Sequence, residues 1–130
     1  MLYQIENKEK ALAWEKVESL LSELLANHSE WKSVLLLPPD ITRFHSGAGK
    51  ITAFFYDELT RRGVSVKVLP ALGTHAPMKE EELIRMFGGG IPQDAYLVHD
   101  FRTAVTEIGT VPADVMTEIS QGLFTEDVHV

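Results

Sequence analysis

Two short polar segments of this sequence hold the side chains that could do chemistry. The segment DITR supplies a carboxylate at Asp40, a hydroxyl at Thr42 and a guanidinium at Arg43, and the segment GTH adds Thr74 and the imidazole of His75. An imidazole changes its charge near neutral pH and therefore suits proton transfer. A guanidinium grips a carboxylate or a phosphate through two parallel hydrogen bonds. Together these groups predict a site that holds an anionic ligand beside a proton-transferring histidine.

Each of these residues also has an interpretation that needs no ligand. Asp40 follows two prolines and could end a strand as an Asx turn, and Thr42 could be a turn or capping hydroxyl. Arg43 could be a solvated surface cation, and His75 could be a loop histidine bonded to the backbone. What favours a shared site is that both segments follow apolar runs of strand character.

These apolar runs place the two polar segments at strand ends. SVLLLPP at residues 33–39 is nearly continuous and predicts a strand buried on both faces, and VSVKVLP at residues 64–70 is rich in β-branched residues. Ligands bind in open α/β sheets at the carboxyl ends of the strands. If the two strands are neighbours, the two segments therefore face each other across one cleft.

Helical periodicity surrounds these strands. Apolar residues at three- and four-residue steps predict a helix over residues 10–27, a second helix through Ile51 and Leu59 that ends at Gly63, and a third helix over residues 79–87. Further strands are predicted at residues 95–100, 104–109 and 115–120.

This order predicts the α/β class, as a three-layer Rossmann-like domain with a mainly parallel sheet. A length of 130 residues fits one such domain over residues 1–130. The tail at residues 122–130 alternates like a strand whose partner is missing. We therefore expect a sheet truncated at its C-terminal edge, in the N-terminal portion of a longer protein.

Composition and charge exclude several classes of partner and site. The net charge is −7, and residues 66–130 carry four basic and ten acidic side chains, so we expect no nucleic-acid binding. Cysteine is absent, and His45, His75 and His99 lack the spacing of a metal-binding motif, so no metal site is predicted. With no signal segment and no membrane-length apolar run, we expect a cytoplasmic protein with no membrane partner.

The GAGK segment at residues 47–50 is not a phosphate loop of a known type. A Walker A loop needs glycine where Phe44 stands and Ser or Thr where Ile51 stands, and a dinucleotide fingerprint needs glycine where Thr52 stands. Glycines before a helix could still leave backbone N–H groups open to an anion. Lys50 is equally well explained as a solvated helix residue.

The two polar segments together are similar to a known family. DITR at residues 40–43, GTHAPM at residues 73–78, EEEL at residues 80–83 and HD at residues 99–100 resemble the N-terminal part of the lactate racemase family. Members of that family are nickel-pincer-nucleotide enzymes that racemise or epimerise 2-hydroxy acids. The resemblance implies the same cofactor and the same class of small-molecule substrate, lactate or a sugar acid, for the full-length protein.

The resemblance also implies a role for each site residue. Asp40, Thr42 and Arg43 match the loop that contacts the cofactor phosphate and the substrate carboxylate, with Arg43 at the carboxylate, and Thr74 is expected at the cofactor. His75 matches one of two histidines that act as general acid and base. The lysine that carries the cofactor, the nickel-binding histidine and the second catalytic histidine have no match here. We therefore expect these residues in the missing C-terminal portion, and this chain to be inactive alone.

Two other classes of function fit the same residues. The cleft could belong to a non-catalytic α/β module that binds a nucleotide or another phosphate. Alternatively, the open sheet edge could make the chain an interaction domain that self-associates.

Overall fold

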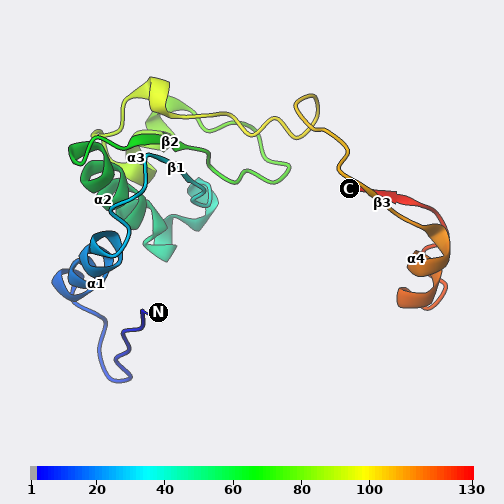
Figure 1. Cartoon of the computed structure of the whole chain (residues 1–130), viewed down its shortest axis with the longest axis horizontal. Helices are drawn as coiled ribbons and strands as arrows, with labels where there is room; N and C mark the ends of the chain where they lie inside the picture. Colours follow the sequence, from blue (N-terminus) through cyan, green and yellow to red (C-terminus); the bar gives the residue numbers. More distant parts are fainter. Residues whose placement is uncertain (1–2) are drawn as a thin grey trace. The chain divides into compact units, whose positions relative to one another are not determined.

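The computed structural model describes residues 3–130, which form two compact units, one up to residue 99 and one from residue 100 to residue 130 (Figure 1). The single domain over residues 1–130 stays a prediction. No helix within the described range is both long and apolar enough to cross a membrane.

The first unit alternates helices and strands in the predicted order. Its elements are α1 (Trp14–Ala26), β1 (Ser33–Leu36), the 3-10 helix η1 (Ile41–Ser46), α2 (Ala48–Arg61), β2 (Ser65–Val68), α3 (Glu80–Phe87) and the 3-10 helix η2 (Gln93–Ala95). The strands β1 and β2 pair in parallel, with Ser33 opposite Ser65 and Leu36 opposite Val68. These elements confirm the α/β class and the parallel sheet, although α1 begins at Trp14 rather than near Lys10.

The strand predicted over residues 95–100 is reduced to one point of contact with β2. Tyr96 forms an isolated parallel bridge with Val68, and the backbone N–H of Leu97 donates to the Val68 carbonyl at 2.8 Å. The chain then leaves the sheet. The parallel order β1, β2, Tyr96 is the arrangement that the predicted crossovers require.

Helices cover one face of this sheet. Val34 and Leu36 of β1 and Val66 and Val68 of β2 pack against helices, whereas Leu35 between them is 49% exposed. The prediction that this strand is buried on both faces was wrong, because successive side chains of a strand point to opposite faces and the described helices pack on only one of them. Residues 3–99 thus show two of the three expected layers, the sheet and one helical layer (Figure 1).

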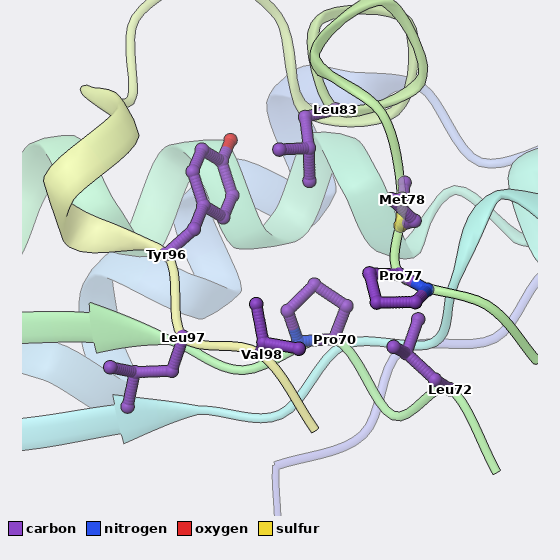
Figure 2. A pocket seen from close by; sticks show the side chains of 8 residues that line it. All are labelled: Pro70, Leu72, Pro77, Met78, Leu83, Tyr96, Leu97 and Val98. Atoms are coloured by element: carbon purple, nitrogen blue, oxygen red, sulfur yellow. The ribbon is translucent and has the colours of Figure 1, made fainter. Parts of the chain in front are cut away.

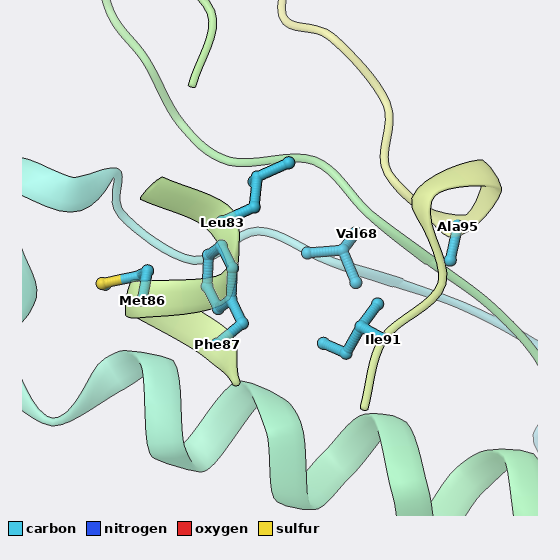
Figure 3. Packing of buried hydrophobic residues seen from close by; sticks show 6 residues of the cluster. All are labelled: Val68, Leu83, Met86, Phe87, Ile91 and Ala95. Carbon is cyan, nitrogen blue, oxygen red and sulfur yellow. The ribbon is translucent and has the colours of Figure 1, made fainter. Parts of the chain in front are cut away.

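Two apolar clusters fix the strands to the helices. The first joins β2 to α3 and to the segment around η2 (Figure 3) and consists of Val68, Leu83, Met86, Phe87, Ile91 and Ala95. The second joins α1, α2 and β2 through Leu25, Leu59 and Val66. Val68 is completely buried in the first cluster. Since it is the last residue of β2, this packing fixes the point from which the next loop leaves the sheet.

Two helix ends follow the expected chemistry. α2 is followed by Gly63 at a φ of 75°, a left-handed conformation that glycine adopts without steric cost, as predicted for this position. α3 begins after Lys79, which has no capping oxygen. Glu82 instead accepts a hydrogen bond from the Lys79 backbone N–H at 2.8 Å, so one half of a capping box is present.

The second unit consists of β3 (Thr110–Val111), α4 (Ala113–Ile119) and β4 (Val128–His129), with β3 and β4 antiparallel. The strands predicted over residues 104–109 and 115–120 were wrong. The first range contains no strand, and most of the second lies in α4. The helix is favoured because Pro112 precedes it, Asp114 lies in its positively polarised first turn, and Asp127 accepts a hydrogen bond from the Ala113 N–H.

Candidate functional site

Parallel pairing continues past the ends of β1 and β2 and brings the two polar loops together. The Leu69 N–H donates to the Leu36 carbonyl at 2.9 Å, and the Ala71 N–H donates to the Pro38 carbonyl at 2.8 Å. Pro39 and Ala71 form an isolated parallel bridge. The loops that contain DITR and GTH therefore start side by side, at the carboxyl edge of the sheet.

The predicted site residues line one open cleft of about 560 Å³ between these loops, a volume within the range of small-molecule sites. The full lining is Leu37, Pro39, Asp40, Thr42, Arg43, Ala71, Leu72, Gly73, Thr74 and His75. The sequence indicated the polar members of this set. It did not predict the apolar wall formed by Leu37 and Leu72. The apolar runs that lead into the two loops could have indicated this wall.

Asp40 is the buried centre of the site, with 4% of its surface exposed. It precedes η1, and its Oδ1 accepts hydrogen bonds from the Thr42 N–H at 3.0 Å and from the Thr42 hydroxyl at 2.5 Å. This contact is the Asx-type turn considered for Asp40. Its Oδ2 accepts a hydrogen bond from Nδ1 of His75 at 2.5 Å. Asp40 therefore accepts hydrogen bonds from residues of both loops.

The hydrogen bonds to Asp40 favour its ionised form. The hydrogen bond from His75 is the largest cause that lowers the pKa of Asp40, followed by that from the Thr42 side chain, and these outweigh the opposing effect of burial. A buried carboxylate that accepts three hydrogen bonds remains charged at neutral pH. The site thus contains a fixed negative charge beneath an imidazole.

His75 is held at one ring nitrogen and exposed elsewhere. Its side chain is 59% exposed, and its backbone N–H closes a turn by donating to the Leu72 carbonyl at 3.0 Å. Gly73 occupies that turn at a φ of 58°. Among the described residues, Nε2 of His75 has no hydrogen-bond partner. The ring therefore lines the cleft with one nitrogen engaged and the other available.

Arg43 and Thr74 supply the remaining polar groups of the cleft. Both residues are exposed, and within residues 3–130 neither side chain forms a hydrogen bond or an ion pair. Their positions in the two loops put a guanidinium and a hydroxyl on the same cleft as His75. These are the donors that an incoming carboxylate or phosphate could use.

The glycines of GAGK have structural reasons. Gly47 precedes α2 at a φ of 77°, and a Cβ on Gly49 would lie 1.9 Å from the Met86 carbonyl oxygen of α3. Gly49 is therefore required for the close approach of two helices. The Lys50 ammonium lies 4.2 Å from the centre of the Trp14 ring, as a cation over an aromatic face.

The other histidines lie outside this cleft. His45 packs edge-on against the Phe44 ring with 5.3 Å between the ring centres, and His99 is not part of the cleft lining. Residues 3–130 contain no group of three or more histidine, aspartate or glutamate side chains placed to hold a metal ion.

A smaller apolar pocket adjoins the second loop (Figure 2). Its lining consists of Pro70, Leu72, Pro77, Met78, Leu83, Tyr96, Leu97 and Val98. Leu72 also lines the main cleft, so the two hollows lie on the same loop. Burial, with a smaller contribution from Tyr56, raises the pKa of Tyr96 to about 12, so this phenol stays neutral. The pocket offers apolar walls and no acid or base at neutral pH.

A parallel α/β sheet with its cleft at the carboxyl ends of adjacent strands defines a Rossmann-like domain. The family model of the lactate racemase N-terminal domain matches residues 5–130, and the chain belongs to this family. This confirms the resemblance read from the two loop motifs.

A solved structure supports the same fold. The crystal structure of a protein from Thermotoga maritima is 30% identical to this chain and superposes with a TM-score of 0.75. The match covers 91% of this chain and 29% of that one, so the chain spans about 29% of the length of this relative. No curated protein matches the chain.

Proposed function

We propose that this chain supplies half of the active site of a racemase or epimerase that acts on a 2-hydroxy acid. The observation that carries the proposal is the cleft in which His75, held by a buried carboxylate, shares its walls with the unpaired Arg43. Membership of the lactate racemase N-terminal domain family supports the reaction class. The remainder of the site comes from sequence outside this chain.

Arg43 binds the carboxylate of the substrate. A 2-hydroxy acid carries its carboxylate directly on the reacting carbon, so a bidentate grip on the carboxylate also fixes the orientation of C2. Arg43 has no competing ion pair within the described residues. Lysine could not replace this function fully, because an ammonium is a point charge without the planar fork.

His75 transfers the hydroxyl proton. Inversion at C2 can proceed by loss of the C2 hydrogen as hydride together with the hydroxyl proton, which gives a planar ketone, and by return of both with the hydride added to the opposite face. The available Nε2 of His75 takes the hydroxyl proton in the first half and returns it in the second. The ring suits this exchange because Nδ1 is held by Asp40 while Nε2 is left to accept and return a proton.

The nickel-pincer nucleotide of the family, when bound, supplies the hydride acceptor for this reaction. The donors present here fit its anionic end, since Arg43 and Thr74 both face the cleft with unused hydrogen-bond donors. Residues 3–130 supply no cluster that could ligate nickel. Thr42 and Asp40, also predicted at the cofactor, contribute by shaping the loop that carries Arg43.

The test uses the full-length protein loaded with cofactor. We expect it to interconvert the two configurations at C2 of lactate or a sugar acid, and we expect His75→Ala to abolish this exchange. His45→Ala, which changes a histidine outside the cleft, serves as the matched control and should retain turnover. Unchanged turnover in His75→Ala would contradict the proposed role of His75 and the proposed function.

The exposed donors of the cleft also favour a second candidate, a non-catalytic module that binds a nucleotide or another phosphate. Calorimetry with 2-hydroxy acids and with mononucleotides separates the two functions. Binding of mononucleotides by a full-length protein that has no C2 exchange would favour the module. Exchange that depends on His75 would favour the enzyme.

A further inference from the structure

We propose that Asp40 is the positioning residue of His75: it fixes the proton on Nδ1 of the ring and so makes Nε2 the atom that exchanges protons with the substrate. This inference rests on the proposed function for its catalytic meaning. The pairing itself is a property of the chain without any ligand, and it assigns Asp40 to His75 rather than to the cofactor.

A hydrogen bond between Asp40 and His75 joins the two loops. Oδ2 of Asp40 and Nδ1 of His75 are 2.5 Å apart. An ionised carboxylate can only accept hydrogen bonds, so the proton of this contact belongs to Nδ1. In the neutral ring the lone pair is then on Nε2, which has no partner among the described residues. The geometry thereby defines one tautomer.

The carboxylate of Asp40 has a fixed orientation. Oδ1 of Asp40 receives both the backbone N–H and the hydroxyl of Thr42, at 3.0 and 2.5 Å. Two donors from one residue hold the plane of the carboxylate, and its burial excludes water from competing for it. Oδ2 therefore points at His75 before any ligand arrives.

The backbone of His75 is anchored within its own loop. The turn closed by the His75 N–H and the Leu72 carbonyl fixes the backbone, and Leu72 is buried in the core. The parallel bridge between Pro39 and Ala71 sets the separation of the two loops. The pair is thus built on the sheet register, which is the support that a preorganised catalytic group needs.

The same contacts argue against Asp40 as a phosphate ligand. A carboxylate brings no donor to a phosphate and repels it, and both oxygens of Asp40 are already occupied. The hydroxyl of Thr42 is directed to Asp40 as well. Anion binding in this cleft then falls to Arg43 and Thr74. Of the three polar residues in the DITR segment, Arg43 therefore serves the ligand, and Asp40 and Thr42 serve His75.

The test measures the tautomer of His75 by long-range ¹H–¹⁵N NMR on the chain of residues 1–130, at a pH where the ring is neutral. We expect Nδ1 to be protonated and Nε2 to be bare. Asp40→Asn should reverse this pattern. The two Thr42 donors would hold the amide oxygen, the amide NH₂ would face His75, and Nδ1 would have to accept, the same wrong-tautomer effect known for an asparagine beside a catalytic histidine.

Asp57→Asn is the matched control, because it makes the same change at an exposed position of α2 that lies outside the cleft, and it should leave the tautomer unchanged. A bare Nδ1 in the unmodified chain overturns the inference, and so does an unchanged tautomer in folded Asp40→Asn. If Asp40→Asn does not fold, the measurement on the unmodified chain still decides.

A turnover measurement separates this inference from the proposed function. In the cofactor-loaded full-length protein, Asp40→Asn should lower kcat by roughly 100-fold or more with KM nearly unchanged, because the reversed tautomer leaves no lone pair on Nε2 to accept the hydroxyl proton. The expected tautomer in a protein whose C2 exchange does not need His75 supports the pair and contradicts the proposed function. Exchange that needs His75 but is unaffected by Asp40→Asn contradicts the pair alone.

Discussion

Gly49 of α2 lies directly against the backbone of Met86 in α3, so closely that a Cβ at position 49 would be 1.9 Å from the Met86 carbonyl oxygen. No rotamer change relieves such an overlap, because the obstacle is backbone. The two helices must separate to admit any side chain. This contact explains a glycine that the sequence suggested only as part of an anion-binding loop.

The first prediction follows from this contact. Gly49→Ala should lower the free energy of unfolding by about 2 kcal/mol or more, as expected for an overpacked helix interface. Gly89→Ala is the control, since a Cβ at that position meets nothing within 4 Å and its φ is not positive. Urea unfolding of both variants provides the comparison. Equal stability of the two would show that α2 and α3 do not approach as described.

A second prediction concerns the two faces of the sheet. Leu59 is 1% exposed beneath the covered face, whereas Leu35 on the opposite face is 49% exposed. Leu59→Ala should therefore destabilise the fold by about 2 to 5 kcal/mol, the usual cost of a cavity in a core. Leu35→Ala should cost less than about 1 kcal/mol.

Thermal and urea unfolding of the two leucine variants tests this difference. The chemical change is identical, so only the environment differs between them. A large cost for Leu35→Ala would mean that another layer covers this face in solution. It would then contradict the exposed face described for residues 3–99.

The sequence predicted the elements of the first unit well because each is determined by local signals. The apolar stripes of α1 and α2 recur at helical spacing, and Gly63 ends α2 with a left-handed residue that favours glycine. The two strands that carry the site loops were predicted because they are short apolar runs with proline at their ends. Their neighbour relation then followed from the rule for parallel sheets.

The failures arose where the deciding interaction is distant in sequence or where a short pattern is ambiguous. Residues 115–120 contain apolar positions that fit either a strand or a helix, and the capping hydrogen bond that the Ala113 N–H donates to Asp127 is not visible as a local motif. The reason for Gly49 lies in α3, and the hydrogen bond that His75 donates to Asp40 depends on the register of two strands. The sequence placed Asp40 and His75 in one cleft without predicting the hydrogen bond between them.

A third prediction uses the lowered pKa of Asp40. In the folded chain this pKa lies below its ordinary value of 3.8, first because of the hydrogen bond from His75 and then because of Thr42. Ionised Asp40 therefore stabilises the fold fully above about pH 4, and this contribution is lost as the pH falls through the lower folded-state pKa. Asp40→Asn should lower stability at neutral pH, with a difference that shrinks in acid.

Urea unfolding over a series of pH values measures this linkage. The difference in unfolding free energy between the unmodified chain and Asp40→Asn should narrow below about pH 4. A difference that is constant with pH would contradict a lowered pKa at Asp40. In His75→Ala, the pKa of Asp40 should move back toward its ordinary value, because the largest cause of the shift is removed. NMR of the Asp40 carboxyl carbon reports this directly.

The last prediction concerns Arg43, which has no partner within the described residues. If it grips the substrate carboxylate, Arg43→Ala should weaken binding of the 2-hydroxy acid to the full-length protein by roughly 10-fold or more, the value of a hydrogen bond to a charged group. Arg43→Lys should recover part of this affinity, because it restores the charge without the bidentate geometry. Arg61→Ala is the control, since Arg61 is exposed on α2 and pairs with Glu58 at 2.7 Å. Calorimetry measures the affinity of each variant. Equal affinity in Arg43→Ala and Arg61→Ala would show that Arg43 does not bind the substrate carboxylate. Of the two donors assigned to the anion, Thr74 alone would then remain.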